Sequence, residues 1–285
     1  MTPLAVGVAG LVLLFVLIAL RFPIAWALAL VGIIGHSVLV SFEATLGQIG
    51  MVAWENGTSF VFVAVPLYIL MGQLIFHLGL SEDFFDGAFK WLGRLPGGLS
   101  VAAVGACAGF GAVTGSSLVA TTTMGGIVMP ELKRYGYDPA LATGSLAAAG
   151  TLAILIPPSI LLVVYGMWTE TSIGALFMAG VLPGLLLSVL FAGFIVVRCL
   201  INPALGPRGP VFTLRERVQA IRPAAPLVLL FAAILVGIYA GAVSVTEAAG
   251  VGVGVVLVLG LFMKRLSRAA VGAAVKETTM LSGVI

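Results

Sequence analysis

The sequence predicts an all-α integral membrane protein, and three features of composition and pattern indicate this fold class. Hydrophobic residues make up 61% of the 285 residues, charged residues only 9%, and the mean hydropathy is +1.21. An ordinary soluble domain carries roughly 25% charged residues, so most of this surface must face lipid. Apolar runs near membrane-spanning length recur along the chain, and two longer apolar stretches carry helix-breaking residues. The pattern therefore predicts multiple transmembrane helices with a re-entrant helical hairpin and an unwound, proline-broken helix.

Seven apolar runs approach or exceed the roughly 20 residues that a spanning helix needs. They lie at residues 4–20, 24–41, 59–80, 139–168, 173–200, 223–243 and 247–263. The first run lacks the basic start and the small-residue cleavage site of a signal peptide, so it is interpreted as a membrane helix. Residues 42–58 and 81–95 mix acidic, aromatic and apolar side chains, as helices at a membrane interface do.

The basic residues predict the topology, because Lys and Arg favour the cytoplasmic side. They gather at Arg21, at Lys90 and Arg94, at Lys133 and Arg134, between 198 and 222, and from Lys264 onward. The connections 42–58, 169–172 and 244–246 carry none. Segment 99–129 has basic residues at both ends, so it is predicted to enter the membrane and return on the same side. The polar linker 201–222 is predicted to be cytoplasmic and to separate two halves of a larger membrane domain.

The first predicted helix break is Thr114-Gly115-Ser116-Ser117, midway along the hairpin segment. Glycine disfavours a helix interior, and Ser or Thr can cap a new helix start. Unsatisfied backbone groups in lipid cost several kcal/mol each, so such a break is expected only beside protein or a polar cavity. The alternative is that these small residues merely permit close helix packing.

The second predicted break lies within residues 150–159, at Pro157 and Pro158. Neither proline has an amide hydrogen, so the carbonyls of Ala153 and Ile154 lose their helical partners. Ile156 precedes a proline and is expected to be extended. Freed carbonyls of this kind can coordinate a dehydrated sodium ion. The alternative is a simple proline kink whose carbonyls are satisfied by neighbouring side chains.

Other polar residues are explained more simply. His36 and His77 lie near helix ends and are interpreted as tolerated interfacial histidines, and Thr246 is expected to cap a helix with Glu247 in its first turn. An intramembrane protease using Ser116 or Ser117 would need a general base within hydrogen-bond reach, which the predicted topology does not supply. The chain is therefore predicted not to be an enzyme, and nothing in it indicates nucleic-acid binding.

Several motifs resemble the large membrane subunit of the tripartite ATP-independent periplasmic (TRAP) transporters. The matching segments are 111–117, 129–131, 135–137, 147–152, 156–159, 165–166, 169–173, 237–241 and 246–249. The resemblance implies a first inverted repeat at 1–200, with scaffold helices in 1–95, the hairpin at 99–129, the broken helix at 139–168 and a helix at 173–200. Residues 223–285 would start a second repeat, which is incomplete, so the chain is expected to be a C-terminally truncated fragment.

The resemblance implies a sodium-coupled secondary transporter that imports an organic acid by an elevator motion in the bacterial inner membrane. Its expected partners are a small (Q-type) membrane subunit and a periplasmic solute-binding protein. The implied Na⁺ ligands are Thr114, Ser117, Ala153, Ile156 and Pro157. The implied substrate-contacting residues are Gly115, Ser116, Ser117, Pro158 and Ser159. Ala153 departs from the glycine expected in the family pattern. The alternative is a single-polypeptide Na⁺- or H⁺-coupled dicarboxylate carrier of similar hairpin architecture.

Overall fold

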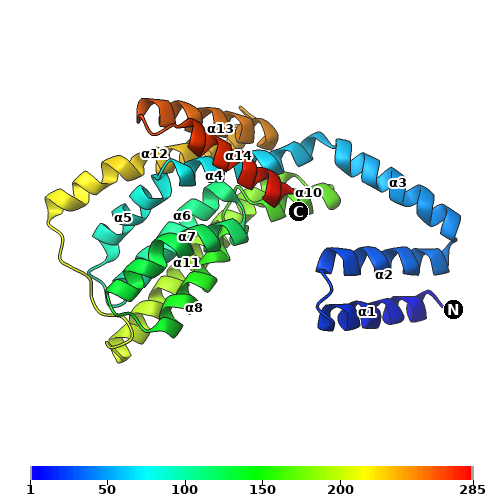
Figure 1. The fold of residues 1–285 in the computed structure, drawn as a ribbon, viewed down its shortest axis with the longest axis horizontal. Coiled ribbons are helices and arrows are strands. Elements are labelled where there is room, and N and C mark those ends of the chain that lie inside the picture. The colour runs from blue at the N-terminus through cyan, green and yellow to red at the C-terminus, as the bar shows by residue number, and fades with distance from the viewer. Residues whose placement is uncertain (1, 284–285) are drawn as a thin grey trace. The chain divides into compact units, whose positions relative to one another are not determined.

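The computed structural model describes residues 2–283, and within that range the regular elements are all helices, as predicted (Figure 1). The chain divides into two compact units, the first ending at Ser59 and the second beginning at Phe60. The first unit contains α1 (Pro3–Ala19), α2 (Ile24–Leu39) and α3 (Phe42–Thr58). The second contains η1 (Phe60–Val63), α4 (Ala64–His77), α5 (Leu80–Leu92), α6 (Gly98–Thr114), α7 (Ser117–Arg134), α8 (Pro139–Gly150), α9 (Leu152–Leu155), α10 (Ile160–Trp168), α11 (Ile173–Ile201), α12 (Leu214–Tyr239), α13 (Val245–Phe262) and α14 (Arg268–Ser282).

Several helices are long and apolar enough to cross a bilayer. Four qualify singly among the described residues: η1 with α4, and then α11, α12 and α13. The pair formed by Pro139–Leu155 and Ile160–Trp168 qualifies as a fifth span that bends by 42°. Helices α1, α2 and α6 are apolar but have only 17, 16 and 17 residues. These lengths confirm a multi-pass membrane protein, whereas the re-entrant placement of the hairpin and the division into repeats stay predictions.

In the first unit, α2 packs against both α1 and α3. The imidazole Nδ1 of His36 lies 2.9 Å from the Thr45 hydroxyl, and that hydroxyl donates to the Ser41 carbonyl at 2.7 Å. Ser37 also donates to Thr45 Oγ1 at 3.1 Å. His36 is thus held by neighbouring polar groups between α2 and α3.

The second unit is built around α6, which is buried along almost its whole length. Its neighbours include α4, α5, α7, α8, α9 and α11, and Figure 1 shows α6, α7, α8 and α11 running side by side. The segment from Gly98 to Thr114 consists mainly of Gly, Ala, Ser, Val and Thr, with Phe110 as its one aromatic residue. Small side chains let helix backbones approach closely, which explains how one helix contacts so many others.

Two helices begin with a capping box. In α12, Thr213 Oγ1 accepts from the Glu216 N–H at 3.3 Å, and Glu216 Oε2 accepts from the Thr213 N–H at 2.7 Å. The helix therefore starts at Leu214, inside the segment 201–222 that the sequence predicted to be a linker. In α13 the cap is Ser244, paired with Glu247, so the prediction that Thr246 caps this helix was wrong. In both cases reciprocal hydrogen bonds satisfy two backbone amides that a helix start leaves free.

The hydroxyl of Tyr137 joins the start of α6 to the segment before α12. It accepts from the Leu99 N–H at 3.0 Å and donates to the Pro207 carbonyl at 2.9 Å. A tyrosine hydroxyl is protonated at neutral pH, and burial raises the pKa of Tyr137 further, to about 12, so the hydroxyl can make both bonds. Tyr137 thereby satisfies a buried amide of the first helical turn.

We expect Tyr137→Phe to lower the free energy of unfolding by about 1–3 kcal/mol, because the buried Leu99 N–H loses its acceptor. Thermal unfolding of the purified protein in detergent would measure the change. Tyr165→Phe is the matched control, since Tyr165 is 55% exposed. Equal midpoints for the two variants would show that the Tyr137 hydroxyl does not stabilise this junction.

Candidate functional site at the hairpin tip and the broken helix

The hairpin turn between α6 and α7 occupies two residues. Gly115 has φ +63°, and its N–H donates to the Gly111 carbonyl at 2.8 Å, which ends α6. Ser116 then caps α7, its hydroxyl accepting from the Val119 N–H at 3.5 Å. Glycine adopts a positive φ without steric penalty, and serine is a preferred N-cap, so this dipeptide ends one helix and begins the next. The predicted break is confirmed as a helix–turn–helix, not merely close packing within one helix.

The second break separates α9 from α10. Ile156 is extended, with φ −81° and ψ 121°, and the helix resumes at Ile160 after Ser159, whose hydroxyl accepts from the Leu162 N–H at 3.4 Å. Within residues 2–283 no hydrogen bond reaches the carbonyls of Ala153 or Ile154. The two prolines that follow remove the amides that would otherwise pair with these oxygens.

The two breaks meet directly. The Ile160 N–H donates to the Gly115 carbonyl at 3.1 Å, which links the hairpin tip to the residue where α10 begins. A Cβ atom added at Gly115 would lie 2.8 Å from the Pro158 carbonyl oxygen and 3.2 Å from the Ser159 Cα. The absence of a side chain at Gly115 therefore allows the contact between the two segments.

Closely spaced glycines surround this junction. A Cβ added at Gly111 of α6 would lie 2.6 Å from the Ala153 Cβ. On α11, a Cβ at Gly180 would lie 2.5 Å from the Leu155 carbonyl oxygen, and one at Gly184 would lie 2.5 Å from the Ile156 Cγ1. Helices α6 and α11 thus hold the broken segment through backbone-level contacts.

The predicted site residues differ in burial and in their contacts. Thr114, Gly115, Ala153, Ile156, Pro157, Pro158 and Ser159 are buried, whereas Ser116 and Ser117 are half-buried. The Thr114 hydroxyl is buried without a hydrogen-bond partner in the described part of the chain, and its methyl group packs against Gly72 of α4. Ser117 makes no hydrogen bond to the broken segment within residues 2–283. The structure therefore brings Gly115 together with residues 158–160, and it places the other predicted residues on the segments flanking that contact.

Comparison with known proteins identifies the family. A family model described as "Tripartite ATP-independent periplasmic transporter, DctM component" matches residues 11–285. The chain belongs to this family.

Three relatives of this DctM-family chain are transporter permeases named for different solutes. The C4-dicarboxylate TRAP transporter large permease protein DctM of Pseudomonas aeruginosa is 39% identical over 217 residues, covering 75% of this chain and 50% of that protein. The ectoine TRAP transporter large permease protein TeaC of Halomonas elongata is 30% identical over 270 residues, covering 94% and 63%. The isethionate TRAP transporter permease protein DctMQ of Oleidesulfovibrio alaskensis is 31% identical over 245 residues, covering 85% and 38%. The chain spans about half the length of the curated relatives it matches.

The oxygen atoms of this DctM-family site suit an alkali cation. Hard cations favour oxygen ligands, and the junction offers the unpartnered Thr114 hydroxyl together with the carbonyls of Ala153 and Ile154. No group of three His, Cys, Asp or Glu side chains that could hold a metal ion occurs among residues 2–283. In secondary transporters, backbone carbonyls of unwound helices coordinate such cations.

Sequence reasoning missed several residues that build the site. It did not single out Gly72, Gly180 or Gly184, nor the Ile160 amide that bonds to Gly115. Close helix approach to a break has no local pattern beyond the high glycine content of 37 residues in 285. The signal that could have found Gly180 and Gly184 is their i, i+4 spacing, which puts both on one face of α11.

The contact between Gly111 and Ala153 predicts a coupled pair of substitutions. We expect Gly111→Ala alone to lower the free energy of unfolding by about 1–3 kcal/mol, because its methyl group would overlap the Ala153 side chain. Ala153→Gly in the same protein should restore only part of the loss, because the added methyl group also lies 2.7 Å from the Ala153 Cα, which glycine keeps. A double-mutant cycle of thermal unfolding would measure the coupling. Strictly additive effects would contradict a direct contact between the two residues.

Proposed function

We propose that this chain is part of a sodium-coupled secondary transporter that imports an organic acid delivered by a periplasmic binding protein. Membership in the DctM family supports the transporter class. The hydrogen bond from the Ile160 N–H to the Gly115 carbonyl is the observation on which the coupling proposal rests. It joins two helix breaks that the sequence predicts to lie inside the membrane, where exposed backbone groups persist only beside protein or a polar cavity.

The sodium ion would be held between α6–α7 and the broken segment. Its proposed ligands are the Thr114 and Ser117 hydroxyls and the carbonyls of Ala153, Ile156 and Pro157. The buried, unpartnered Thr114 hydroxyl supports this assignment, because buried polar groups normally have a partner. Among the three carbonyls, that of Ala153 accepts no hydrogen bond within residues 2–283, because Pro157 has no amide hydrogen to donate to it.

The solute carboxylate would bind beside the same junction. The proposed contacts are Gly115, Ser116 and Ser117 at the hairpin tip, with Pro158 and Ser159 from the break. Two helices, α7 and α10, begin here after Ser116 and Ser159, and helix N-termini favour anions through free N–H groups and a partial positive charge. The relatives are named for different solutes, so we propose an organic acid and no single compound.

The proposed partners follow from the family. A small membrane subunit would brace the moving domain in the bacterial inner membrane, and the binding protein would deliver the solute from the periplasm. Packing of α6, α9 and α11 around the junction supports an elevator motion, since these elements would move together with the site. The alternative single-polypeptide carrier would need no binding protein.

Uptake into proteoliposomes would test the proposal. The full-length protein would be reconstituted with its small subunit, and uptake of a labelled organic acid measured with and without an inward sodium gradient and the binding protein. We expect uptake only when both are supplied. Uptake without the binding protein would favour the single-polypeptide carrier, and uptake driven equally well without sodium would exclude sodium coupling.

A further inference from the structure

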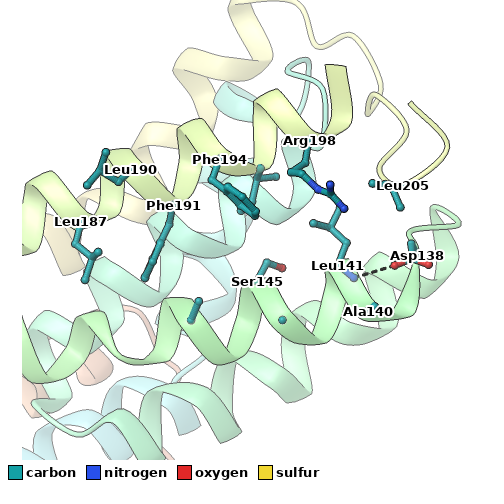
Figure 2. Close-up of a pocket in the computed structure, with 13 residues that line it drawn as sticks. Asp138, Ala140, Leu141, Ser145, Leu187, Leu190, Phe191, Phe194, Arg198 and Leu205 are labelled. Atoms are coloured by element: carbon teal, nitrogen blue, oxygen red, sulfur yellow. Dashed lines mark hydrogen bonds between the residues drawn. The ribbon is translucent and has the colours of Figure 1, made fainter. Parts of the chain in front are cut away.

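An apolar groove runs between α8 and α11, on residues that the proposed transport site does not use. Its volume is about 830 Å³. Figure 2 shows α11 contributing Leu187, Phe191 and Phe194 along one wall, opposite Ser145 and Leu141 of α8. Almost all of the lining surface is apolar, so the groove suits a hydrocarbon chain better than a polar solute.

The two walls of the groove have different shapes. Along α8 the lining residues Ala140, Gly144 and Ala148 recur every four residues, which places small side chains on one helical face. A Cβ added at Gly144 would meet no atom within 4 Å, so the groove is open above this residue. On α11 the large side chains of Leu190 and Phe194 are exposed, whereas Leu187 is half-buried and packs against the hydrophobic core.

One end of the groove carries charge. The guanidinium of Arg198 extends from α11 toward the start of α8 (Figure 2) and forms no salt bridge among the described residues. The one acidic residue lining the groove, Asp138, uses its Oδ1 to accept the Leu141 N–H at 2.9 Å and so caps α8. Its charge is partly offset by the helix N-terminus, whereas Arg198 is paired with no acidic side chain of residues 2–283.

The groove has the length of one membrane leaflet. From Leu187 to Arg198 the helix rises about 16 Å at 1.5 Å per residue. Half of the hydrocarbon thickness of a bilayer is about 15 Å. The positive-inside pattern of the sequence places Arg198 on the cytoplasmic side, where the leaflet is rich in anionic lipids. A single acyl chain could thus lie along the groove with its headgroup at Arg198.

We propose that this groove binds an anionic phospholipid of the cytoplasmic leaflet. The acyl chain lies over Gly144 between α8 and α11, and the phosphate accepts hydrogen bonds from the Arg198 guanidinium, whose planar donors match phosphate oxygens. A zwitterionic lipid could fill the same groove, but its cationic headgroup would weaken the attraction to Arg198. The proposal rests on the membrane location of the chain and is independent of sodium coupling.

Lipid binding to the full-length protein would test the inference. The protein would be purified in detergent and titrated with phosphatidylglycerol or phosphatidylcholine of identical acyl chains, with native mass spectrometry reporting lipid occupancy and thermal unfolding reporting stabilisation. We expect phosphatidylglycerol to bind more tightly and to raise the unfolding midpoint further. Equal binding of the two lipids would overturn the proposal.

Two substitutions test the headgroup contact and the acyl-chain contact separately. Arg198→Gln should weaken phosphatidylglycerol binding roughly tenfold, because a charge-assisted hydrogen bond is lost. Arg208→Gln, an exposed residue of the 201–222 segment outside the groove, is its control and should change nothing. Unchanged phosphatidylglycerol binding in Arg198→Gln would overturn the headgroup assignment.

Gly144→Leu should exclude the acyl chain by filling the floor of the groove. Gly193→Leu is the matched control, since a Cβ at Gly193 of α11 also meets no atom within 4 Å and this residue does not line the groove. Both variants should remain monodisperse on size exclusion. If Gly144→Leu binds phosphatidylglycerol as well as Gly193→Leu does, the acyl chain does not lie in this groove.

Discussion

Gly115→Ala is expected to abolish most transport while leaving the protein folded. The added methyl group would lie 2.8 Å from the Pro158 carbonyl oxygen, at a backbone φ of +63° that alanine adopts only with strain. The strain alone costs about 1–2 kcal/mol. The overlap would also push the hairpin tip away from the break and weaken the Ile160–Gly115 hydrogen bond. We expect the initial rate of sodium-driven uptake to fall at least roughly tenfold, equivalent to about 1.4 kcal/mol of distortion at the site.

Gly136→Ala is a control that introduces the same kind of backbone strain without a steric clash. Gly136 has φ +71°, and a Cβ there would meet no atom within 4 Å. This control should lose a similar amount of stability from backbone strain and yet transport normally per folded protein. Uptake by reconstituted variants, normalised to monodisperse protein, would make the comparison. If both variants transported equally well, the contact between the hairpin tip and the broken helix would not matter for function.

The positions of both helix breaks could be predicted because their causes are local. Pro157 and Pro158 remove amides wherever they occur, and a Gly115-Ser116 pair can end one helix and cap another in any context. The capping boxes at Thr213 and Ser244 were equally readable, since each is followed three residues later by glutamate. The polar composition of 201–222 instead predicted a linker through residue 222. Thr246 was predicted as the cap of α13, whereas the cap is Ser244.

The contacts of the site could not be predicted in the same way. The Ile160 N–H meets Gly115 where α6 packs against Ala153 and α11 packs against Leu155 and Ile156. Gly180 and Gly184 contribute to that packing by lacking side chains. These close contacts depend on how α6, α9, α10 and α11 pack against one another. The sequence of a single helix carries no periodic pattern that predicts them. The sequence likewise gives no indication that the Thr114 methyl group packs against Gly72.

Pro157→Ala is expected to weaken sodium dependence selectively. The substitution restores a backbone N–H that can donate to the Ala153 carbonyl, so α9 would extend and one proposed sodium ligand would be occupied. We expect the sodium concentration for half-maximal uptake to rise roughly tenfold, because a lost ligand worth about 1.4 kcal/mol changes affinity by that factor. The apparent KM for the solute at saturating sodium should change little. Uptake measured across a sodium titration would give both quantities.

Pro226→Ala provides the control, since Pro226 lies inside the continuous helix α12, which packs mainly against α5 and α13. It restores an amide in a membrane helix in the same way but away from the junction, so its sodium dependence should match the unsubstituted protein. A reduced maximal rate in Pro157→Ala with unchanged sodium dependence would support a simple proline kink instead, because a kink positions the helices without binding an ion. A rightward shift of the sodium curve in Pro157→Ala alone would place the Ala153 carbonyl in the coupling site.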